Sequence, residues 1–379
     1  MTQETERRAR TSVGALSRFI GPQASLGFGA WAVGGSGWGA PADEADREAA
    51  VRLALERGVT FFDTAPTYGD GASETILGRA LQRDRERVAI ATKVGPHDDP
   101  RASLEASLRR LQTEYVDLVQ LHEPHGTWER AIEGLHKLQE QGKALAIGIC
   151  NATHLQLRRA MEVAPVVSLQ GPYNLFDRDV EERELPVCRE RGLAFLAYRP
   201  LAAGLLTGKF SAPPPFSPGD HRRRIYWFQG KEFERRRAVI EHLRPVAARL
   251  EMTVTRLALS WLLSQSGVSV VLVGVRNRHQ AEESLSPGTR PLTPDTLQEV
   301  DAIVAGGFPL ARATEQLQQL ATTWGERERF IVDRLDGTTP YERIGAAWTD
   351  RGDSPLIAAQ VKVFVDQLAE QGLLVTDDR

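Results

Sequence analysis

Four side chains able to give or hold a proton follow three consecutive strand-like runs in this chain of 379 residues. Asp63 ends the first run, and Tyr68 lies in the loop after it; Lys93 closes the second run and His122 the third. Each side chain alone has ordinary structural uses. The carboxyl ends of consecutive parallel strands, however, meet at one mouth of a barrel. We therefore expect these four groups to converge on one site.

Together, these residue types support transfer of a proton to a carbonyl oxygen. A tyrosine, with a pKa of about 10, is a poor acid near neutrality unless a cation stabilises its phenolate. Lys93 beside Tyr68 would supply that cation, and Asp63 would orient and neutralise the lysine. Tyr68 could then protonate the oxygen, with His122 as a second hydrogen-bond donor to it. No side chain is a source of hydride, so the reaction would require a nicotinamide cofactor.

The elements that must position these groups alternate along the chain. Short apolar runs predict strands at residues 26–30, 59–63, 88–92, 116–121, 145–149, 166–169, 193–197 and 268–273. Helical periodicity predicts helices at residues 44–57, 74–81, 102–111, 128–141, 155–161, 180–191 and 232–263. Eight strands alternating with helices over about 250 residues predict an α/β fold, a (β/α)8 TIM barrel.

The segment GSGWGA at residues 35–40 matches the G-x-G-x-x-A fingerprint of a Rossmann dinucleotide site. In that fold the glycines turn directly from a strand into a helix, whose N-terminus meets a pyrophosphate. Here Pro41 and Ala42 intervene, and Asp43 is typical of the N-cap of a helix that starts later. We therefore interpret the segment as a loop after the first strand.

Several stretches resemble the aldo-keto reductase family, across roughly residues 15–305. They are LGFGAWAVGG, GVTFFDTAPTYGDGASETILGRAL, ATKVG, SLRRLQTEYVDLVQLHEP, GKALAIGICNAT, YRPLAAGLLTGK and LVGVRNRHQAEESL. The resemblance implies a (β/α)8 barrel without a Rossmann domain, usually with NADPH as cofactor. It also assigns the family's catalytic tetrad to Asp63, Tyr68, Lys93 and His122, in agreement with the chemistry above.

The same resemblance implies residues that bind the nicotinamide end of the cofactor. Asn151 and Gln170 would meet the carboxamide, and Tyr198 would stack on the ring. Cys150 stands where the family often has Ser, which leaves one carboxamide contact open. Arg199 departs from the small residue common after the stacking tyrosine and could reach the pyrophosphate.

Residues 274–284 resemble the family's adenosine-phosphate segment. The matching positions are Gly274, Arg276, Gln280 and Glu283, while Ser284 replaces the usual Asn. Because a guanidinium pairs well with a 2′-phosphate, Arg276 favours NADPH over NADH. Arg278 could share that task or be a solvated charge at the start of a helix.

Loop residues predict where a substrate would bind. The candidates are Trp31, His125, Trp128, Tyr226 and Trp227. The last two belong to residues 211–230, a segment with four prolines and three consecutive arginines. We interpret this segment as a lid over the mouth; a surface excursion with its aromatic residues tucked beneath it is the alternative. His122 and His125 are spaced for a metal only on a helix, and Pro124 makes their segment a loop, so we expect no metal site.

After residues 306–309, GGFP, the alternation stops and the sequence reads as helices only. Apolar residues there are spaced for one-sided burial: Ile331/Leu335, Tyr341/Ile344/Trp348 and Val361/Val365/Leu368. Ser354-Pro355 fits a helix N-cap followed by a first-turn proline. The sequence thus predicts a flexible arm at 1–14, the barrel at 15–307 and a small helical domain at 308–379. The tail's LDGTT and closing GLL resemble winged-helix modules of the peptide-binding PqqD type.

Composition and charge exclude several classes of protein. The chain is 41% hydrophobic and 26% charged, and no apolar run reaches the roughly 18 residues of a membrane span. Two cysteines are too few for a disulfide framework or a structural zinc site. The net charge is −3, and residues 308–379 hold eight Lys/Arg against twelve Asp/Glu, which disfavours nucleic acid. No signal peptide is recognised. We expect a cytoplasmic protein without membrane or nucleic-acid partners.

The sequence therefore predicts an NADPH-dependent oxidoreductase that reduces an aldehyde or ketone, with Tyr68 as proton donor. The alternative is a regulatory barrel of the same fold that binds NADPH and signals to a peptide or protein partner through the C-terminal domain. The complete tetrad argues against this alternative, because a sensor needs no proton donor.

Overall fold

The computed structural model describes most of the chain. The described residues are 14, 16–21, 23–39, 42–286, 288–306, 311–313, 325–335, 344, 347–348, 361, 364–365, 368 and 374–376. The arm predicted at residues 1–14 lies outside them except for Gly14. None of the helices in this part of the chain is long and apolar enough to cross a lipid bilayer.

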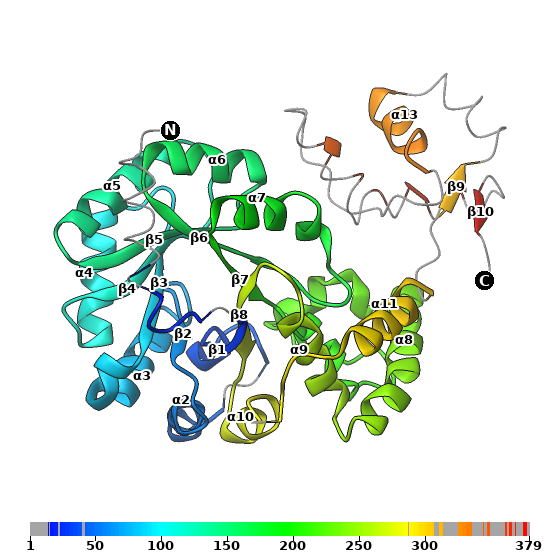
Figure 1. Ribbon diagram of the computed structural model, residues 1–379, viewed down its shortest axis with the longest axis horizontal. Helices are drawn as coiled ribbons and strands as arrows, with labels where there is room; N and C mark the ends of the chain where they lie inside the picture. Colours follow the sequence, from blue (N-terminus) through cyan, green and yellow to red (C-terminus); the bar gives the residue numbers. More distant parts are fainter. Residues whose placement is uncertain are drawn as a thin grey trace.

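Eight parallel strands close into a barrel surrounded by helices (Figure 1). They are β1 (Ser25–Gly29), β2 (Phe61–Asp63), β3 (Ala89–Val94), β4 (Val116–Leu121), β5 (Ala144–Cys150), β6 (Val166–Pro172), β7 (Ala194–Tyr198) and β8 (Val268–Gly274). Each strand pairs with the next, and β8 returns to β1 with Val270 opposite Ser25. Every residue of β2, β3 and β4 is buried, as expected of parallel strands covered on both faces. The predicted (β/α)8 barrel is confirmed.

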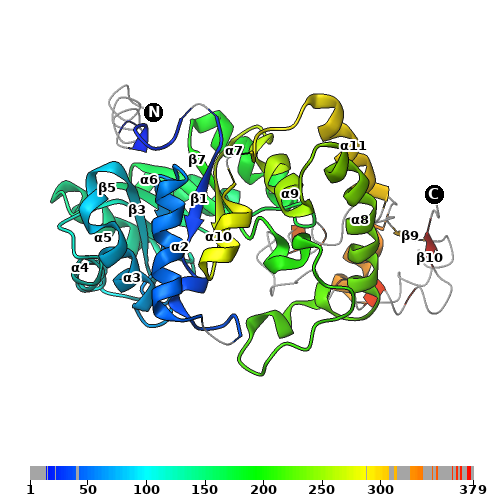
Figure 2. The ribbon, with the colours of Figure 1, turned by 90° about the horizontal axis from the view of Figure 1, so that it is seen from below.

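Helices cover the outside of the barrel. They are α2 (Glu44–Glu56), α3 (Ala72–Leu81), α4 (Pro100–Leu111), α5 (Glu129–Glu140), α6 (His154–Val163), α7 (Glu184–Arg191), α8 (Gly230–Arg249), α9 (Val254–Leu263), α10 (Arg278–Ser284) and α11 (Pro294–Gly306). Figure 2 shows α10 beside α2, and α11 beside α8. Short 3-10 turns line the loops, among them η1 (Ala32–Gly34), η4 (Ala202–Thr207), η5 (His221–Arg224) and η6 (Tyr226–Phe228).

The single long helix predicted at residues 232–263 was wrong, because the chain turns between α8 and α9. Glu251 has a left-handed φ of 54°, which ends the first helix. Thr253 then caps α9, its hydroxyl accepting a hydrogen bond from the Arg256 amide at 3.2 Å. The apolar periodicity continues across this turn, so the pattern alone did not reveal the break.

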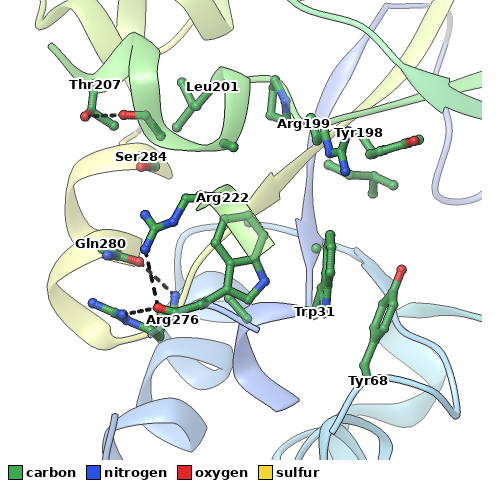
Figure 3. Close-up of a pocket in the computed structure, with 18 of the residues that line it drawn as sticks. Trp31, Tyr68, Tyr198, Arg199, Leu201, Thr207, Arg222, Arg276, Gln280 and Ser284 are labelled. Carbon is green, nitrogen blue, oxygen red and sulfur yellow. Dashed lines mark hydrogen bonds between the residues drawn. The ribbon is translucent and has the colours of Figure 1, made fainter. Parts of the chain in front are cut away.

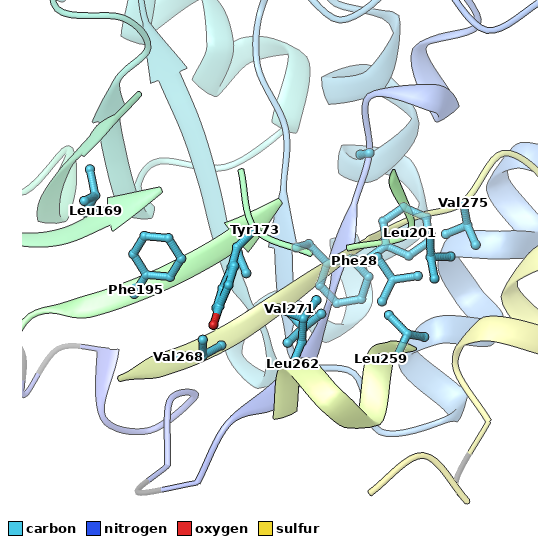
Figure 4. Packing of buried hydrophobic residues seen from close by; sticks show 14 of the residues in the cluster. Phe28, Leu169, Tyr173, Phe195, Leu201, Leu259, Leu262, Val268, Val271 and Val275 are labelled. Atoms are coloured by element: carbon cyan, nitrogen blue, oxygen red, sulfur yellow. The ribbon is translucent and has the colours of Figure 1, made fainter. Parts of the chain in front are cut away.

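Two hydrophobic clusters hold the barrel together. One fills its interior and includes Leu118, Leu196 and Val270; Leu16, from the segment before β1, belongs to it as well. The other lies between strands and helices, where residues such as Leu262 on α9 pack against the strands (Figure 4). Because both faces of the strands are closely packed, side chains at the strand ends have little freedom to move.

Part of the C-terminal segment is described. It contains α13 (Glu326–Val332) and two short strands, β9 (Ala311–Ala313) and β10 (Leu374–Thr376). The prediction of helices alone was wrong, because these strands pair antiparallel with Leu374 opposite Ala313. Strands of three residues are too short for an alternating pattern to be recognised.

The apolar residues predicted to be buried in the C-terminal segment form a cluster of their own. Its members include Ile331, Leu335, Ile344, Trp348, Val361, Val365 and Leu368. None of them belongs to the two barrel clusters. Tyr341 and the cap predicted at Ser354-Pro355 lie outside the described residues. The division into domains at residue 307 stays a prediction.

Candidate active site

A cavity of about 800 Å³ opens at the carboxyl ends of the barrel strands. Residues from all of the predicted groups line it: Trp31, Asp63, Tyr68, His122, Asn151, Gln170, Tyr198, Arg199, Gly274, Arg276, Gln280 and Glu283. In Figure 3, Tyr68 and Tyr198 lie on one side of this cavity, and Arg276 and Gln280 on the other. Because the carboxyl ends of the strands meet at one mouth of the barrel, residues that are spread over more than half of the sequence lie together there.

A buried ion pair lies beneath Tyr68. The ammonium of Lys93, on β3, donates hydrogen bonds to both carboxylate oxygens of Asp63, at 2.8 and 2.7 Å, and to the carbonyl of Thr64 at 2.8 Å. Lys93 is only 1% exposed. Burial alone would lower the pKa of this ammonium, but the facing charges of Asp63 and Tyr68 raise the pKa above its ordinary value. Lys93 is therefore charged at neutral pH.

Two buried amides complete the surroundings of Asp63. Gln170 donates to the Asp63 carboxylate at 2.8 Å, and Gln120 donates to the same oxygen at 3.3 Å. Gln170 comes from β6, on the opposite side of the barrel from β2, and Gln120 comes from β4, two strands away from β2. A buried carboxylate needs such donors because burial removes its water. The sequence analysis identified Gln170 for another role and missed Gln120.

Tyr68 is held by its backbone as well as by its ring. A Cβ atom added to Gly69, whose φ is 63°, would lie 2.0 Å from the carbonyl oxygen of Gly34. The chain after Tyr68 therefore passes so close to η1 that only glycine fits there. The ring stacks on Trp31 with centroids 5.9 Å apart, and the Lys93 ammonium lies 4.9 Å from its centre. Tyr68 is thus fixed between the cavity and the ion pair.

Burial raises the pKa of Tyr68 to about 12, although the Lys93 ammonium acts to lower it. The sequence analysis anticipated the effect of the lysine but not the larger effect of burial. At neutral pH the phenol therefore keeps its proton, as a proton donor must. The nearby cation would stabilise the phenolate that forms once the proton has left.

His122 follows β4 and faces the ring of Tyr68, with ring centroids 6.0 Å apart. Burial and the positive charge of Lys93 lower the pKa of His122 from 6.5 to about 3. The imidazole is therefore neutral at physiological pH. A neutral imidazole carries one N–H and can donate a single hydrogen bond.

The lowered pKa of His122 predicts a pH effect on stability. Unfolded His122 takes up a proton below about pH 6.5, whereas folded His122 resists protonation until about pH 3. Its contribution to stability is thus complete above pH 6.5 and is lost as the pH falls toward 3. We expect His122→Asn to flatten the fall in unfolding free energy between these limits, measured by urea denaturation at stepped pH. An equally steep fall in the variant would contradict the assignment, and His279→Asn, at an exposed histidine, is the matched control.

The residues predicted for a nicotinamide form a connected group. The Tyr198 hydroxyl donates to the Asn151 side-chain oxygen at 2.9 Å, and the Asn151 amide donates to the His122 carbonyl at 3.3 Å. The Arg199 guanidinium lies 5.6 Å from the centre of the Tyr198 ring. Asn151 and Arg199 both have left-handed backbones, with φ of 54° and 55°. Such strain in residues other than glycine concentrates at binding sites.

The residues predicted for the adenosine phosphates lie after β8. Gln280 accepts a hydrogen bond from the Arg276 amide at 3.0 Å, and the Arg276 guanidinium donates to the Trp38 carbonyl at 2.8 Å. Arg278, in contrast, is exposed and pairs with Glu282 at 3.0 Å, away from the cavity lining. Of the two arginines considered for this role, Arg276 is the one that lines the cavity.

The 211–230 segment reaches across to the loop after β1. The His221 amide donates to the Gly37 carbonyl at 3.0 Å, and the His221 ring lies 4.7 Å from Trp31 and 4.2 Å from Trp38. The GSGWGA loop is thus held by the 211–230 segment, and α2 begins only at Glu44, unlike in a Rossmann site. The segment supplies cavity-lining residues, as the lid interpretation expects, but its Trp227 and Phe228 are buried, as the alternative expects.

Several predicted substrate residues do not line the cavity. Trp227 is buried in the barrel core, and Tyr226 lies against it with ring centroids 6.0 Å apart. Trp128 is buried just before α5. His125 is exposed, and its ring packs on that of His97. Among the described residues, no group of three or more His, Cys, Asp or Glu is arranged to hold a metal.

Other residues, which the sequence analysis did not identify, line the cavity. They are Trp38, Glu123, Thr207, Lys209, Phe216 and Arg222. Phe216 and Arg222 belong to the 211–230 segment, whose three arginines were a visible signal. Which of its residues face inward depends on how the segment folds back, and residue type does not determine that.

Comparison with known proteins supports one family. The model of the aldo/keto reductase family matches residues 25–305. The aldo-keto reductase YhdN of Bacillus subtilis is 37% identical over 275 residues, which cover 68% of this chain and 82% of that protein. The structure of a glycerol dehydrogenase from Gluconobacter oxydans has a TM-score of 0.69 and 34% identity, covering 75% of this chain and 92% of that one.

An aldo-keto reductase from Klebsiella pneumoniae, solved in complex with NADPH, has a TM-score of 0.58 and 26% identity, covering 74% of this chain and 90% of that one. None of these comparisons supports the PqqD-like resemblance of the C-terminal segment, a protein partner or the regulatory alternative. The family match spans the whole barrel and contains every residue of the predicted tetrad. The chain therefore belongs to the aldo/keto reductase family of oxidoreductases.

Proposed function

We propose that this protein reduces an aldehyde or ketone to an alcohol with NADPH, and runs the reverse reaction on the alcohol. The observation that carries the proposal is the position of the Tyr68 phenol at the cavity wall, above the buried Lys93–Asp63 pair. A carbonyl oxygen that accepts this proton needs an acid that is neutral before the reaction and stabilised as an anion after it.

The cavity suits a nicotinamide dinucleotide in its distribution of chemical groups. Near Tyr68 it offers the amides of Asn151 and Gln170 and the face of Tyr198, whereas its far end carries cations such as Arg276. An aromatic face and amides suit the nicotinamide ring and its carboxamide, and guanidinium groups suit phosphates. Structures of similar proteins from Klebsiella pneumoniae contain NADP or NADPH, which supports the same choice here.

The bound dihydronicotinamide supplies the hydride. The chain's own residues handle the proton and the charge. Tyr68 donates its proton to the carbonyl oxygen, and neutral His122 donates a hydrogen bond that positions the same oxygen. Lys93 stabilises the resulting phenolate, and Asp63 holds the lysine in place with two hydrogen bonds. The rings of Trp31 and Trp38, with centroids 5.1 Å apart, form an aromatic wall of the cavity beside Tyr68.

Titration of tryptophan fluorescence tests the proposal, because Trp31 and Trp38 line the cavity. We expect saturable quenching by NADPH at micromolar concentration and a weaker response to NADH. Carbonyl turnover, followed by the loss of NADPH absorbance, should then be tested with glyceraldehyde first, since a glycerol dehydrogenase is among the similar structures. No saturable response to either nucleotide would overturn the proposal.

A further inference from the structure

A carboxylate that has no part in the proposed mechanism lies close to the proton donor. Glu123 directly follows His122 in the sequence, is exposed and lines the cavity. The His122 ring faces the ring of Tyr68, with centroids 6.0 Å apart. Glu123 therefore lies at the end of the cavity where the carbonyl group would react. The resemblance to the family assigned no role to this residue, so its role has to be inferred from its surroundings.

The backbone on both sides of Glu123 is held by hydrogen bonds from neighbouring loops and helices. The His122 carbonyl accepts from the Asn151 side chain at 3.3 Å. The carbonyl of Pro124, which is buried, accepts from the Gln156 side chain at 2.9 Å. A proline also restricts the backbone of the residue before it. Glu123 is thus carried by a segment with few conformations open to it, and its place at the cavity wall is fixed before a ligand binds.

The charge of Glu123 is not compensated by its neighbours. In the part of the chain that the structure describes, no cation forms a salt bridge with Glu123 and no donor forms a hydrogen bond with its side chain. Lys93 and Asp63 neutralise each other, and His122 is neutral at physiological pH. Burial raises the pKa of the Cys150 thiol, and the negative charge of Glu123 adds to this rise. The field of the carboxylate therefore extends to the buried groups around the tetrad.

The arginines that line the cavity lie in other parts of it. Arg222 and Arg276 lie across the cavity from Tyr68 (Figure 3). Arg199 lies beside Tyr198, with its guanidinium 5.6 Å from the centre of that ring. The cavity thus carries positive charge where the proposed cofactor has its phosphates and negative charge where the carbonyl substrate would bind. Such a distribution suits two ligands of opposite charge.

Aromatic rings at the same end of the cavity also favour a cation. Trp31 stacks on Tyr68 with centroids 5.9 Å apart, and Trp38 meets Trp31 edge-on at 5.1 Å. Both tryptophans line the cavity. Aromatic rings attract cations, and tryptophan does so most strongly, above all for quaternary ammonium groups. A carboxylate together with aromatic rings is therefore suited to an organic cation.

We propose that Glu123 makes the site select carbonyl substrates that carry a positive charge close to the carbonyl group and reject those that carry a carboxylate. This inference rests on the proposed function and names its class of substrate. An aldehyde with an ammonium group would place opposite charges side by side, whereas an aldehyde acid would bring a second carboxylate up to Glu123. The selection acts on the binding of the substrate and leaves the proton transfer from Tyr68 as proposed.

Two aldehydes of the same shape test this proposal. Betaine aldehyde and 3,3-dimethylbutanal differ only at the centre of the trimethyl group, which is a charged nitrogen in the first and a carbon in the second. We expect Glu123→Gln to lower the ratio of their kcat/KM values about 3- to 10-fold, as for loss of a partly exposed ion pair. Because this ratio is compared between variants, the different hydration of the two aldehydes cancels. For 4-oxobutanoate, which is repelled by Glu123, kcat/KM should rise in Glu123→Gln.

Asp70→Asn is the matched control for the loss of a negative charge. Asp70 is exposed, belongs to the loop that carries Tyr68 and does not line the cavity. Its backbone is left-handed, with a φ of 50°, which asparagine also adopts. This variant should keep the wild-type ratio. Salt gives a second readout, because ions screen the attraction: added NaCl should lower the ratio in the wild type and change it much less in Glu123→Gln.

The outcomes separate this inference from the proposed function. If Glu123→Gln keeps the wild-type ratio, or if Asp70→Asn lowers it equally, Glu123 does not select the charge. If the wild type binds NADPH but reduces 4-oxobutanoate best, or reduces none of the three aldehydes, this inference falls while the proposed function stands. If the wild type binds neither NADPH nor NADH, both proposals fall. Should Glu123→Gln not fold, as judged by its thermal transition, the salt dependence of the wild-type ratio decides the question.

Discussion

Replacing Tyr68 by phenylalanine is expected to lower kcat for carbonyl reduction by about 10²- to 10⁴-fold, the range that a positioned general acid contributes. The substitution removes one oxygen and leaves the aromatic ring, which stacks on Trp31 at 5.9 Å. Because the packing is preserved, the affinity for NADPH and the thermal stability should remain those of the wild type. Steady-state kinetics together with a fluorescence titration of NADPH measure both quantities.

Tyr115→Phe is the control for this substitution. Tyr115 lies just before β4, at the opposite end of the barrel, and its ring packs against the Arg85 guanidinium at 4.2 Å. Loss of that hydroxyl should leave turnover unchanged. Full activity in Tyr68→Phe would remove the proton donor from the proposed mechanism. An equal loss in both variants would point instead to a general effect of losing a tyrosine hydroxyl.

Lys93→Met is expected to abolish turnover and also to destabilise the fold. The ammonium lies under the Tyr68 ring, so the phenolate formed in the reaction would lose its stabilising charge. At the same time the carboxylate of Asp63, which is 4% exposed, would keep the amides of Gln120 and Gln170 as its only side-chain partners among the residues that the structure describes. Breaking a buried ion pair by removing one partner costs about 3–5 kcal/mol. Urea denaturation and steady-state kinetics measure the two effects.

The pH dependence of this variant has a definite sign. An unpaired buried carboxylate has a raised pKa, because the protonated form carries no charge into the interior. Folded Lys93→Met would therefore bind a proton at Asp63 more readily than the unfolded chain does. Its unfolding free energy should fall as the pH rises, and the deficit relative to the wild type should shrink in acid.

A double variant separates stability from chemistry. Lys93→Met combined with Asp63→Asn removes both charges, and a neutral amide can still accept hydrogen bonds from the neighbouring glutamines. We expect most of the lost stability to return while turnover stays at the level of Lys93→Met. Recovery of turnover along with stability would mean that Lys93 serves the fold alone.

The convergence of the candidate tetrad could be predicted from the sequence because it depends on local pattern. Apolar runs alternating with helical periods predicted the barrel, and the barrel places strand ends at one mouth. Asp63, Lys93 and His122 each close or follow a buried strand, so their convergence followed from their positions alone. None of these steps required knowing how a distant loop folds.

Only the tertiary structure decided the contacts between distant segments. His221 and the Gly37 carbonyl are 184 residues apart in the sequence, yet their contact places Arg222 in the cavity while Trp227 is turned into the core. Residue type alone could not predict these positions. An arginine is ordinarily exposed to solvent, and a tryptophan in a loop ordinarily suggests a contact with substrate. The register of the 211–230 segment against the loop after β1 determines which of its residues face the cavity.

The electrostatic balance at Tyr68 was also a property of the folded molecule. Sequence reasoning correctly gave the lysine a lowering effect on the phenol pKa, but burial outweighs it and raises the pKa to about 12. Desolvation depends on how many atoms of other elements surround a group, and that number exists only once the barrel has closed. The sequence by itself determined which groups meet at the mouth of the barrel. Their protonation states, and the loop that covers them, were decided by packing between elements far apart in the chain.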